Sequence, residues 1–355
     1  MKEYSMVVGL DLGDTYSRYC ALDSDGEIEG EGRIRNTEKG VRGHFGRLEP
    51  CLVAVEAGTH TWWICRLLSE LGHEVVVANT RRVRAISQNE RKSDKADAEM
   101  LARLARTDRR LLYPVKMRRE RAQTDLAMLK ARDALVGART KLINTVRGLL
   151  KPFGTALPRC SSHAFAARVR PLLPAEHEEA LSGLLDLIGE LTRRIDEYDK
   201  KLEAMVKKEY PEAGLLQKIP GVGPLTSLGF VLVVDEPARF GSNRDVGAYL
   251  GLTPRRDQSG GSDPQLRITR AGNGFMRRLL VSAAQHIMAH ESADGELRRW
   301  AWKLAGGEES RDKRRKKRAV IALARKLAVV MLSLWKSGSC YESFRGVTPK
   351  AEPVP

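Results

Sequence analysis

Cysteine is scarce in this chain of 355 residues, and the five cysteines stand singly. They are Cys20, Cys51, Cys65, Cys160 and Cys340, with no Cys-x-x-Cys pair among them and no histidine at ligand spacing. The odd number argues against a disulfide framework, and the isolated positions argue against a structural zinc site. We therefore expect most of these thiols to lie in the core of a protein from a reducing compartment.

Long apolar runs are also lacking, as are a signal peptide and a lipidation motif. The opening residues, Met1 to Ser5, lead directly into the first apolar stretch. The sequence therefore predicts no membrane partner and a cytoplasmic, nucleoid-associated location.

Acidic residues are outnumbered. The chain has 61 Lys and Arg against 45 Asp and Glu, a net charge of +16 and a pI near 9.8. Lys and Arg that neutralise phosphates release condensed counterions, so such an excess favours nucleic acid as partner. A basic protein of the membrane surface is the competing interpretation.

The hydrophobic patterns divide the chain into three predicted domains, residues 1–113, 114–210 and 211–355. The first alternates strand and helix patterns, which predicts an α/β domain with a mixed sheet. The expected strands cover residues 5–11, 16–22, 51–56 and 74–78, and the expected helices cover 61–71 and 94–107.

The second domain is predicted to be a long helical, coiled-coil segment, because apolar residues recur in it at alternating spacings of three and four. The later seam is Leu181, Leu184, Ile188, Leu191, Ile195, Tyr198, Leu202 and Met205, and the earlier one is Met128, Ala131, Leu135, Ala138, Leu142, Thr145 and Leu149. The two helices are expected to pair with each other or with copies in another subunit.

The earlier helix is also rich in basic residues: Arg118, Arg119, Arg121, Lys130, Arg132, Arg139, Lys141 and Arg147. Such a surface either follows a nucleic-acid backbone or is simply a solvated face.

Four acids of the first domain are predicted to meet. Asp11 closes the apolar run of residues 5–11, and Glu56 ends the run of residues 52–56, so both are expected at the ends of adjacent strands. Asp94 and Asp97 begin a helical stretch on one face. Carboxylate oxygens are the ligands that Mg²⁺ prefers, and two such ions about 3.5–4 Å apart promote phosphodiester chemistry.

Other interpretations of these acids remain open. Asp94 suits a helix N-cap and Asp97 a first helical turn. Asp11, with Gly13 and Thr15, also resembles the first phosphate loop of actin-like ATPases. Basic residues that border the predicted metal site, Arg81, Arg82 and Lys92, are candidates for nucleic-acid binding.

The third domain is predicted to be mostly helical and to open on a helix-hairpin-helix, Leu215 to Leu228. Its Gly221 and Gly223 would present backbone N–H groups to a phosphate, although an ordinary packing corner has the same pattern. The next candidates for nucleic-acid binding are Arg255, Arg256, Arg267 and Arg270. A last basic run, residues 311–318, is either a solvated linker or a phosphate-binding patch.

Five motifs occur together in order: Gly9-Leu-Asp11-Leu-Gly, Val55-Glu56-Ala-Gly58, Lys92-Ser-Asp94-Lys-Ala-Asp97, Ile219-Pro-Gly-Val-Gly223, and Tyr249-Leu-Gly-Leu-Thr-Pro-Arg255 continuing to Ser259-Gly-Gly261. With them the chain resembles, over nearly its whole length, the transposases of the insertion-sequence 110 and 1111 group. The resemblance implies a RuvC-like domain of the ribonuclease H-like fold, joined by a coiled coil to a C-terminal transposase domain.

The resemblance also implies a mechanism. The four acids would bind magnesium, and Ser259 would be the nucleophile that forms a covalent protein-DNA intermediate. A structured RNA encoded by the element would pair with donor and target DNA, and the protein would act as a dimer or tetramer. From the residues alone Ser259 is less secure, because no histidine lies nearby to activate it, a glycine-rich turn explains it equally well, and Ser262 is its rival.

Two further functions compete with this one. The first is a junction-resolving nuclease that uses metal-activated water and leaves no protein on the DNA. The second is a nucleic-acid-binding protein without catalysis, in which the acids are structural.

Overall fold

The computed structural model describes residues 4–79, 83, 93–264, 266–289 and 292–344. The chain forms two compact units, residues 1–117 and 118–355. Each unit is described by itself.

The first unit contains a mixed five-stranded sheet with the strand order β3-β2-β1-β4-β5. The strands are β1 (Val7–Leu12), β2 (Tyr16–Leu22), β3 (Ile28–Arg35), β4 (Leu52–Glu56) and β5 (Glu74–Ala78). The central strand β1 is antiparallel to β2 and parallel to β4. This confirms the predicted α/β domain with a mixed sheet.

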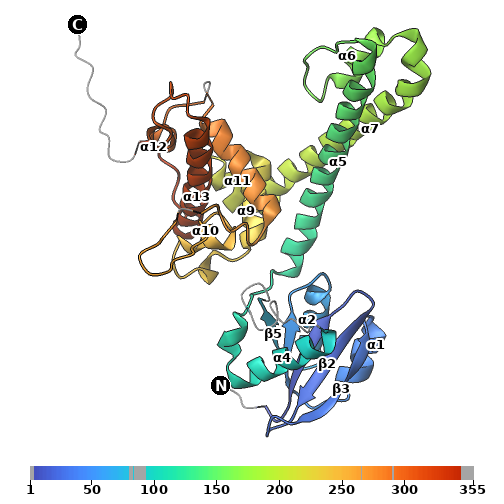
Figure 1. Ribbon diagram of the computed structural model, residues 1–355, viewed down its shortest axis with the longest axis vertical. Coiled ribbons are helices and arrows are strands. Elements are labelled where there is room, and N and C mark those ends of the chain that lie inside the picture. Colours follow the sequence, from blue (N-terminus) through green and yellow to red (C-terminus); the bar gives the residue numbers. More distant parts are fainter. Residues whose placement is uncertain (1–3, 80–82, 84–92, 265, 290–291, 345–355) are drawn as a thin grey trace. The chain divides into compact units, whose positions relative to one another are not determined.

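Helices cover both faces of this sheet (Figure 1). They are α1 (Glu38–Phe45), α2 (Thr61–Glu70) and α4 (Asp94–Thr107). Val8 and Leu10 of β1 pack in one core with α1 and α2, whereas Val7 packs on the other face with residues of α4. Because side chains alternate along a strand, Gly9 and Asp11 belong to the α4 face.

The predicted elements of the first unit are present, but β3 and α1 are additional. β3 is an edge strand, Ile-Glu-Gly-Glu-Gly-Arg-Ile-Arg, in which only Ile34 is buried. Its charges and glycines suit an edge strand and remove the apolar alternation that sequence reading depends on. α1 is eight residues long, and its apolar signal is limited to Val41 and Phe45.

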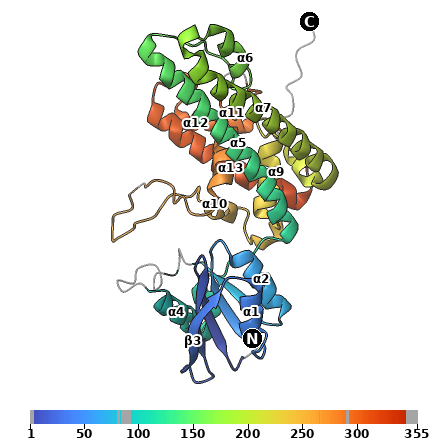
Figure 2. The same ribbon diagram turned by 90° about the vertical axis from the view of Figure 1, so that its right-hand side faces the viewer.

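The second unit begins with two long helices, α5 (Glu120–Leu150) and α7 (Ala175–Glu209), which lie side by side (Figure 2). They run antiparallel, since Arg132 bonds Asp199 and Arg139 bonds Thr192. The pairing within the chain is thus settled. The short helix α6 (Phe165–Val169) packs on α7 at the turn between them.

The buried stripe of α5 differs from the predicted seam. Buried residues are Ala122, Leu126, Leu129, Ile143, Val146 and Leu150, whereas Thr145 and Leu149 of the predicted seam are exposed. On α7 the prediction is closer, because Leu181, Ile188, Ile195, Leu202 and Met205 are all buried. The α5 prediction was wrong because its mixed sequence carries two apolar stripes one residue apart.

Several basic residues of the earlier helix are bonded within the second unit. Arg119 bonds Asp235, Arg121 bonds Glu209, Arg132 bonds Asp199, and Arg147 donates to the carbonyl oxygens of Leu157 and Pro158. These contacts help to hold the unit together, while Lys130 and Lys141 are exposed, so a nucleic-acid surface on this helix stays a prediction.

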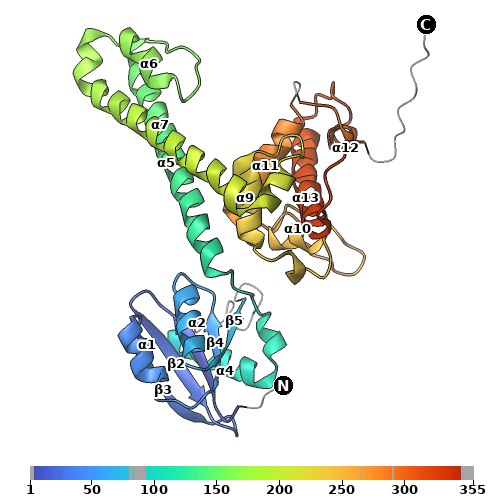
Figure 3. The same ribbon diagram turned by 180° about the vertical axis from the view of Figure 1, so that it is seen from behind.

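The remainder of the second unit is mostly helical, as predicted, and its helices lie packed together (Figure 3). Their buried side chains form one large core with residues of α5 and α7. Its helices are α8 (Pro211–Leu216), α9 (Pro224–Val234), α10 (Asp245–Tyr249), α11 (Gly274–Ile287), α12 (Glu296–Ala305) and α13 (Lys313–Ser337). Short 3-10 helices cover Arg109–Leu112 in the first unit and Lys151–Phe153, Arg170–Leu172 and Pro237–Arg239 in the second. No helix in the described ranges is long and apolar enough to cross a membrane.

Candidate active site

The four predicted acids lie on one side of the first unit's sheet. Asp11 is the fifth residue of β1, and Glu56 is the last residue of β4. The two strands are adjacent and parallel, so these residues come to the same edge. Asp94 and Asp97 occupy the first turn of α4, which covers the face that Asp11 belongs to.

Gly9 brings α4 unusually close to β1. A Cβ atom at this position would lie 2.0 Å from the carbonyl oxygen of Ala98 and 2.6 Å from the amide nitrogen of Ala102. Only glycine therefore allows the helix backbone to rest on the strand, and this contact sets where the first turn of α4 lies. Gly9 is part of a motif in the sequence, but the motif alone does not explain why a glycine is required there.

Ser93, and not Asp94, caps α4. The Ser93 hydroxyl accepts a hydrogen bond from the amide of Ala96 at 3.2 Å, and its backbone is extended. The N-cap interpretation of Asp94 was therefore wrong. Its carboxylate stands one residue inside the helix, near the positive end of the macrodipole.

Electrostatics show that the four acids act on one another. Burial is the largest cause that raises the pKa of Asp11, followed by a hydrogen bond with the Glu56 side chain and the negative charges of Glu56, Asp94 and Asp97. Together they raise this pKa to about 8. Asp11 is 8% exposed, so water screens this repulsion weakly.

The donor set is suited to a hard cation, since it consists of carboxylate oxygens with unbalanced negative charge. Within the described residues, however, no group of three or more His, Cys, Asp or Glu side chains is already arranged around a metal position. Asp11 and Glu56 instead share a hydrogen bond. Metal binding would require Asp11 to lose its proton and the carboxylates to turn toward a common point.

Neighbouring loops fix the two strand ends. The Thr61 hydroxyl donates to the carbonyl oxygen of Glu56 at 2.9 Å and accepts from the amide of Gly58. After β1, the Asn36 amide donates to the carbonyl oxygen of Gly13 at 2.7 Å. These polar side chains were missed from the sequence, because each acts on a backbone group brought near by the fold.

His60 is a further side chain beside the acids that the sequence did not single out. Trp63 donates its indole N–H to Nδ1 of His60 at 3.1 Å, and Nε2 of His60 lies 3.6 Å from Asp14. Nδ1 therefore acts as acceptor, which leaves Nε2 to carry the proton. Asp14 is fully exposed, as expected for a turn residue. Arg81, Arg82 and Lys92 lie outside the described residues.

Ser259 stands at the tip of an exposed arm in the second unit, residues 253–269. Pro254 pairs with Ile268 near the base of the arm. At the tip, the amides and carbonyls of Ser259 and Ser262 bond each other at 3.1 and 3.0 Å, around Gly260 with a φ of +55°. The serine therefore does begin a two-residue glycine turn, and its side chain is exposed.

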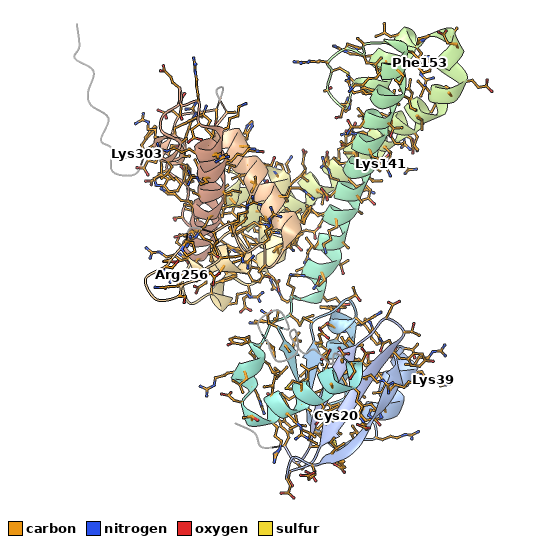
Figure 4. The ribbon with its side chains drawn as sticks, in the orientation of Figure 1. Cys20, Lys39, Lys141, Phe153, Arg256 and Lys303 are labelled. Atoms are coloured by element: carbon orange, nitrogen blue, oxygen red, sulfur yellow. The ribbon has the colours of Figure 1, made fainter. Side chains whose placement is uncertain are left out.

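The four arginines of this region lie on the same arm or at its base, and all are exposed. Arg256 is labelled in Figure 4, and its guanidinium lies 4.0 Å from Asp263. Arg255 donates its amide to the carbonyl oxygen of Arg267, and Arg270 has a positive φ of 54°. The arm thus presents arginine side chains along its length.

Gly221 and Gly223 form the turn between α8 and α9. Gly221 has a φ of +85°, and a Cβ atom there would lie 2.5 Å from Cγ1 of Ile287, so the turn and its packing require glycine. Gly223 is the N-cap residue of α9, and no heavy atom lies within 4 Å of the position of its Cβ. A packing role thus accounts for Gly221, while Gly223 keeps its backbone exposed.

Known proteins match both units. Residues 8–154 match a family described as transposase, the DEDD transposases of IS110, and residues 213–298 match the family described as transposase IS116/IS110/IS902. A probable family 20 transposase of Pseudomonas aeruginosa is 29% identical over 94% of this chain and 98% of its own length.

Two named insertion-sequence transposases are similar as well. The transposase of IS1328 from Yersinia enterocolitica is 30% identical over 83% of this chain and 87% of its own length. That of IS1111A from Coxiella burnetii is 28% identical over 92% of this chain and 89% of its own length. The chain therefore belongs to the IS110 family of insertion-sequence transposases, and it is a DNA transposase.

Proposed function

We propose that this transposase cuts and rejoins DNA with Mg²⁺ held by Asp11, Glu56, Asp94 and Asp97, in a domain of the ribonuclease H-like type. The observation that carries the proposal is geometric: Asp11 and Glu56 lie at the ends of adjacent parallel strands, beside the first turn of α4 with Asp94 and Asp97. Burial and these carboxylates raise the pKa of Asp11. Such a buried excess of negative charge is costly unless a cation or a proton balances it. Bound magnesium, as two ions, would stabilise negative charge on the attacked phosphate.

Ser259 is the proposed nucleophile. Its Oγ would form a bond to phosphorus as the bond from phosphorus to one sugar oxygen breaks, with the serine proton lost and the sugar oxygen protonated. Attack by a sugar hydroxyl of another strand reverses these steps and frees the serine. The exposed tip supports this role, because a phosphate can approach Oγ freely, and the arginines of the arm would stabilise its charge.

Further partners are part of the proposal. Gly223 would offer its backbone to a DNA phosphate as in a helix-hairpin-helix, with Gly221 forming the turn, and the basic border Arg81, Arg82 and Lys92 would contact nucleic acid. A structured RNA would choose the DNA sites, as the family resemblance implies. These roles place the protein on DNA in the cytoplasm.

A second copy of the chain is also a proposed partner. Leu149, Phe153, Leu172 and Leu187, near the turn of the α5–α7 hairpin, are 50%, 65%, 51% and 47% exposed. Leu149 belongs to the predicted heptad seam of α5 and lies outside the buried stripe. The same apolar patch on two copies of the chain can meet in a symmetric dimer.

The test separates the two chemical roles. Asp11→Asn should abolish strand cleavage in Mg²⁺ while DNA binding persists, because it removes an acid without adding bulk. Ser259→Ala should remove the denaturant-resistant protein-DNA adduct, whereas Ser262→Ala should keep it. Cleavage without any adduct in the native protein would instead support a nuclease that uses activated water, and full cleavage by Asp11→Asn would reject the metal site.

A further inference from the structure

The first two turns of α13 carry a dense set of positive charges. Six consecutive residues, 313–318, are Lys or Arg. Two of them serve the fold: Arg315 donates to the carbonyl oxygen of Leu304 at the end of α12, and Lys316 donates to that of Glu308. Lys316 also lies over the ring of Trp302.

The other four residues make no comparable contact within the unit. Lys313, Arg314, Lys317 and Arg318 are exposed, and their side chains make no ion pair or hydrogen bond to a described residue. Their spacing of one, three and one residues places them on one side of the helix. We call these four residues the α13 stripe.

Helix stability does not explain the stripe. Cations at a helix N-terminus oppose the macrodipole, and the pairs Lys313/Lys317 and Arg314/Arg318 are like charges four residues apart, which is also unfavourable. One nearby carboxylate, that of Asp312, offsets part of this charge: its backbone hydrogen bonds to Arg315 and Arg314 lower its pKa, and the charge of Arg318 lowers it further. Asp312 caps α13 by accepting from the amides of Arg314 and Arg315, and Glu308 pairs with Arg298.

The stripe contrasts with the arginines of α5, most of which are bonded to acids or carbonyl oxygens of the same unit. It is held rigidly, because α13 then buries Leu323, Leu327 and Met331 in the core of the unit. A rigid cluster of four cations, only partly offset by Asp312, that costs helix stability indicates a polyanionic partner.

The partner's charge density agrees with this interpretation. From residue 313 to 318 the helix rises about 7.5 Å. Double-stranded DNA carries one negative charge for about every 1.7 Å of its axis, counted over both strands, so this length of duplex holds about four phosphate charges. We propose that the α13 stripe is a contact surface for the sugar-phosphate backbone of duplex DNA, independent of base sequence.

A contact between α13 and α10 relates the α13 stripe to the region of the arm. Arg325 follows Arg318 by seven residues, or two helical turns, and so lies on the same side of α13. Its side chain packs against Gly247 of α10, 3.1 Å from the position of a Cβ there. The side of α13 that carries the stripe thus continues, about two turns further on, into the contact with α10, the helix after which the arm begins in the chain.

The experiment measures how duplex binding depends on salt. In the stripe variant all four residues are changed to Gln in the full-length protein. The control variant changes Lys200, Lys201, Lys207 and Lys208 to Gln, four exposed lysines of α7, so both variants lose four charges. The probe is a linear DNA duplex without element sequence, and EDTA is present so that the acids of the first unit play no part.

We expect the slope of log affinity against log salt to fall by about 0.9 for each lost contact, or about 3 to 4 in the stripe variant. The control should lose less than about 1. The stripe variant should melt no lower than the native protein, because its like-charge repulsion is gone, and this excludes misfolding as the cause.

Equal losses in both variants would show a general effect of charge and overturn the proposal. An RNA duplex of the same length is the second probe. A loss confined to RNA would also overturn it, since the stripe would then serve RNA. Binding is measured without cleavage, so this result does not depend on whether the acidic site or Ser259 is assigned correctly.

Discussion

Asp11 is an acidic residue at a buried position where packing alone would favour an apolar side chain. It lies on the α4 face of the sheet, where apolar neighbours surround it and three other carboxylates are near. A side chain selected only for folding would be apolar here. Its cost to the fold therefore supports a functional role.

The raised pKa of Asp11 predicts how stability depends on pH. The folded state holds the proton more tightly than the unfolded state, so this contribution is complete below about pH 4 and is lost as pH rises to about 8. In EDTA, Asp11→Asn should remove much of this decline and be more stable than the native protein at pH 8 by at least about 1 kcal/mol. Denaturant unfolding between pH 4 and 8 measures both curves.

Magnesium provides the control for this prediction. At pH 8 the cation should raise the unfolding midpoint of the native protein and leave that of Asp11→Asn unchanged, because only the native site binds it. Parallel pH curves for the two proteins would contradict the assigned burial and repulsion at Asp11.

The positions of Asp11 and Glu56 at adjacent strand ends could be predicted from the sequence. An apolar run that ends in an acid locates the acid at a strand end, and parallel neighbours bring such ends to one edge, as they do for Asp11 and Glu56. Residues that act through distant backbone groups, such as Thr61 and Asn36, leave no local pattern. The roles of the acids and of Ser259 remain predictions.

At the scale of the elements, the approach of α4 to β1 decides where Asp94 and Asp97 lie. Gly9→Ala would place a methyl group against the backbone of Ala98 and Ala102, which cannot rotate away. We expect a loss of about 2–4 kcal/mol in the free energy of unfolding, with reduced cleavage in the protein that folds. Denaturant titration and a strand-cleavage assay measure the two effects.

Gly43→Ala is the matched control, since Gly43 lies in α1 with no heavy atom within 4 Å of the position of its Cβ. It should be neutral or stabilising by up to about 1 kcal/mol. Unchanged stability of Gly9→Ala would show that α4 does not rest on β1 as described.

The long helices show where element-scale prediction fails. Heptad spacing identified the helices and most of the buried face of α7, but on α5 it selected Thr145 and Leu149, which are exposed, over Val146 and Leu150, which are buried. Periodicity reports that an apolar stripe exists. It does not report which of two adjacent stripes meets the partner helix, because that depends on the other helix and on the connection between them.

At the scale of the whole molecule, the exposed apolar side chains near the turn of the α5–α7 hairpin bear on whether the chain associates with a second copy. Monomeric proteins expose single apolar side chains routinely, but a clustered set marks an interface. Near the hairpin turn the exposed side chains include Leu149, Phe153, Leu172 and Leu187, and the ring of Phe153 lies against that of His177, with ring centroids 4.1 Å apart. A second copy that covers this surface would account for the apolar composition of the turn.

The double variant Leu149→Glu/Phe153→Glu should therefore lower the oligomeric state, since burying two carboxylates in the interface costs several kcal/mol. Sedimentation velocity across a range of protein concentrations measures the change, and circular dichroism should show unaltered helix content because both positions are exposed in the monomer. Leu111→Glu, an exposed leucine of the first unit, is the control and should keep the native oligomer. If the double variant sediments as the native protein does, the hairpin turn is not an interface between copies.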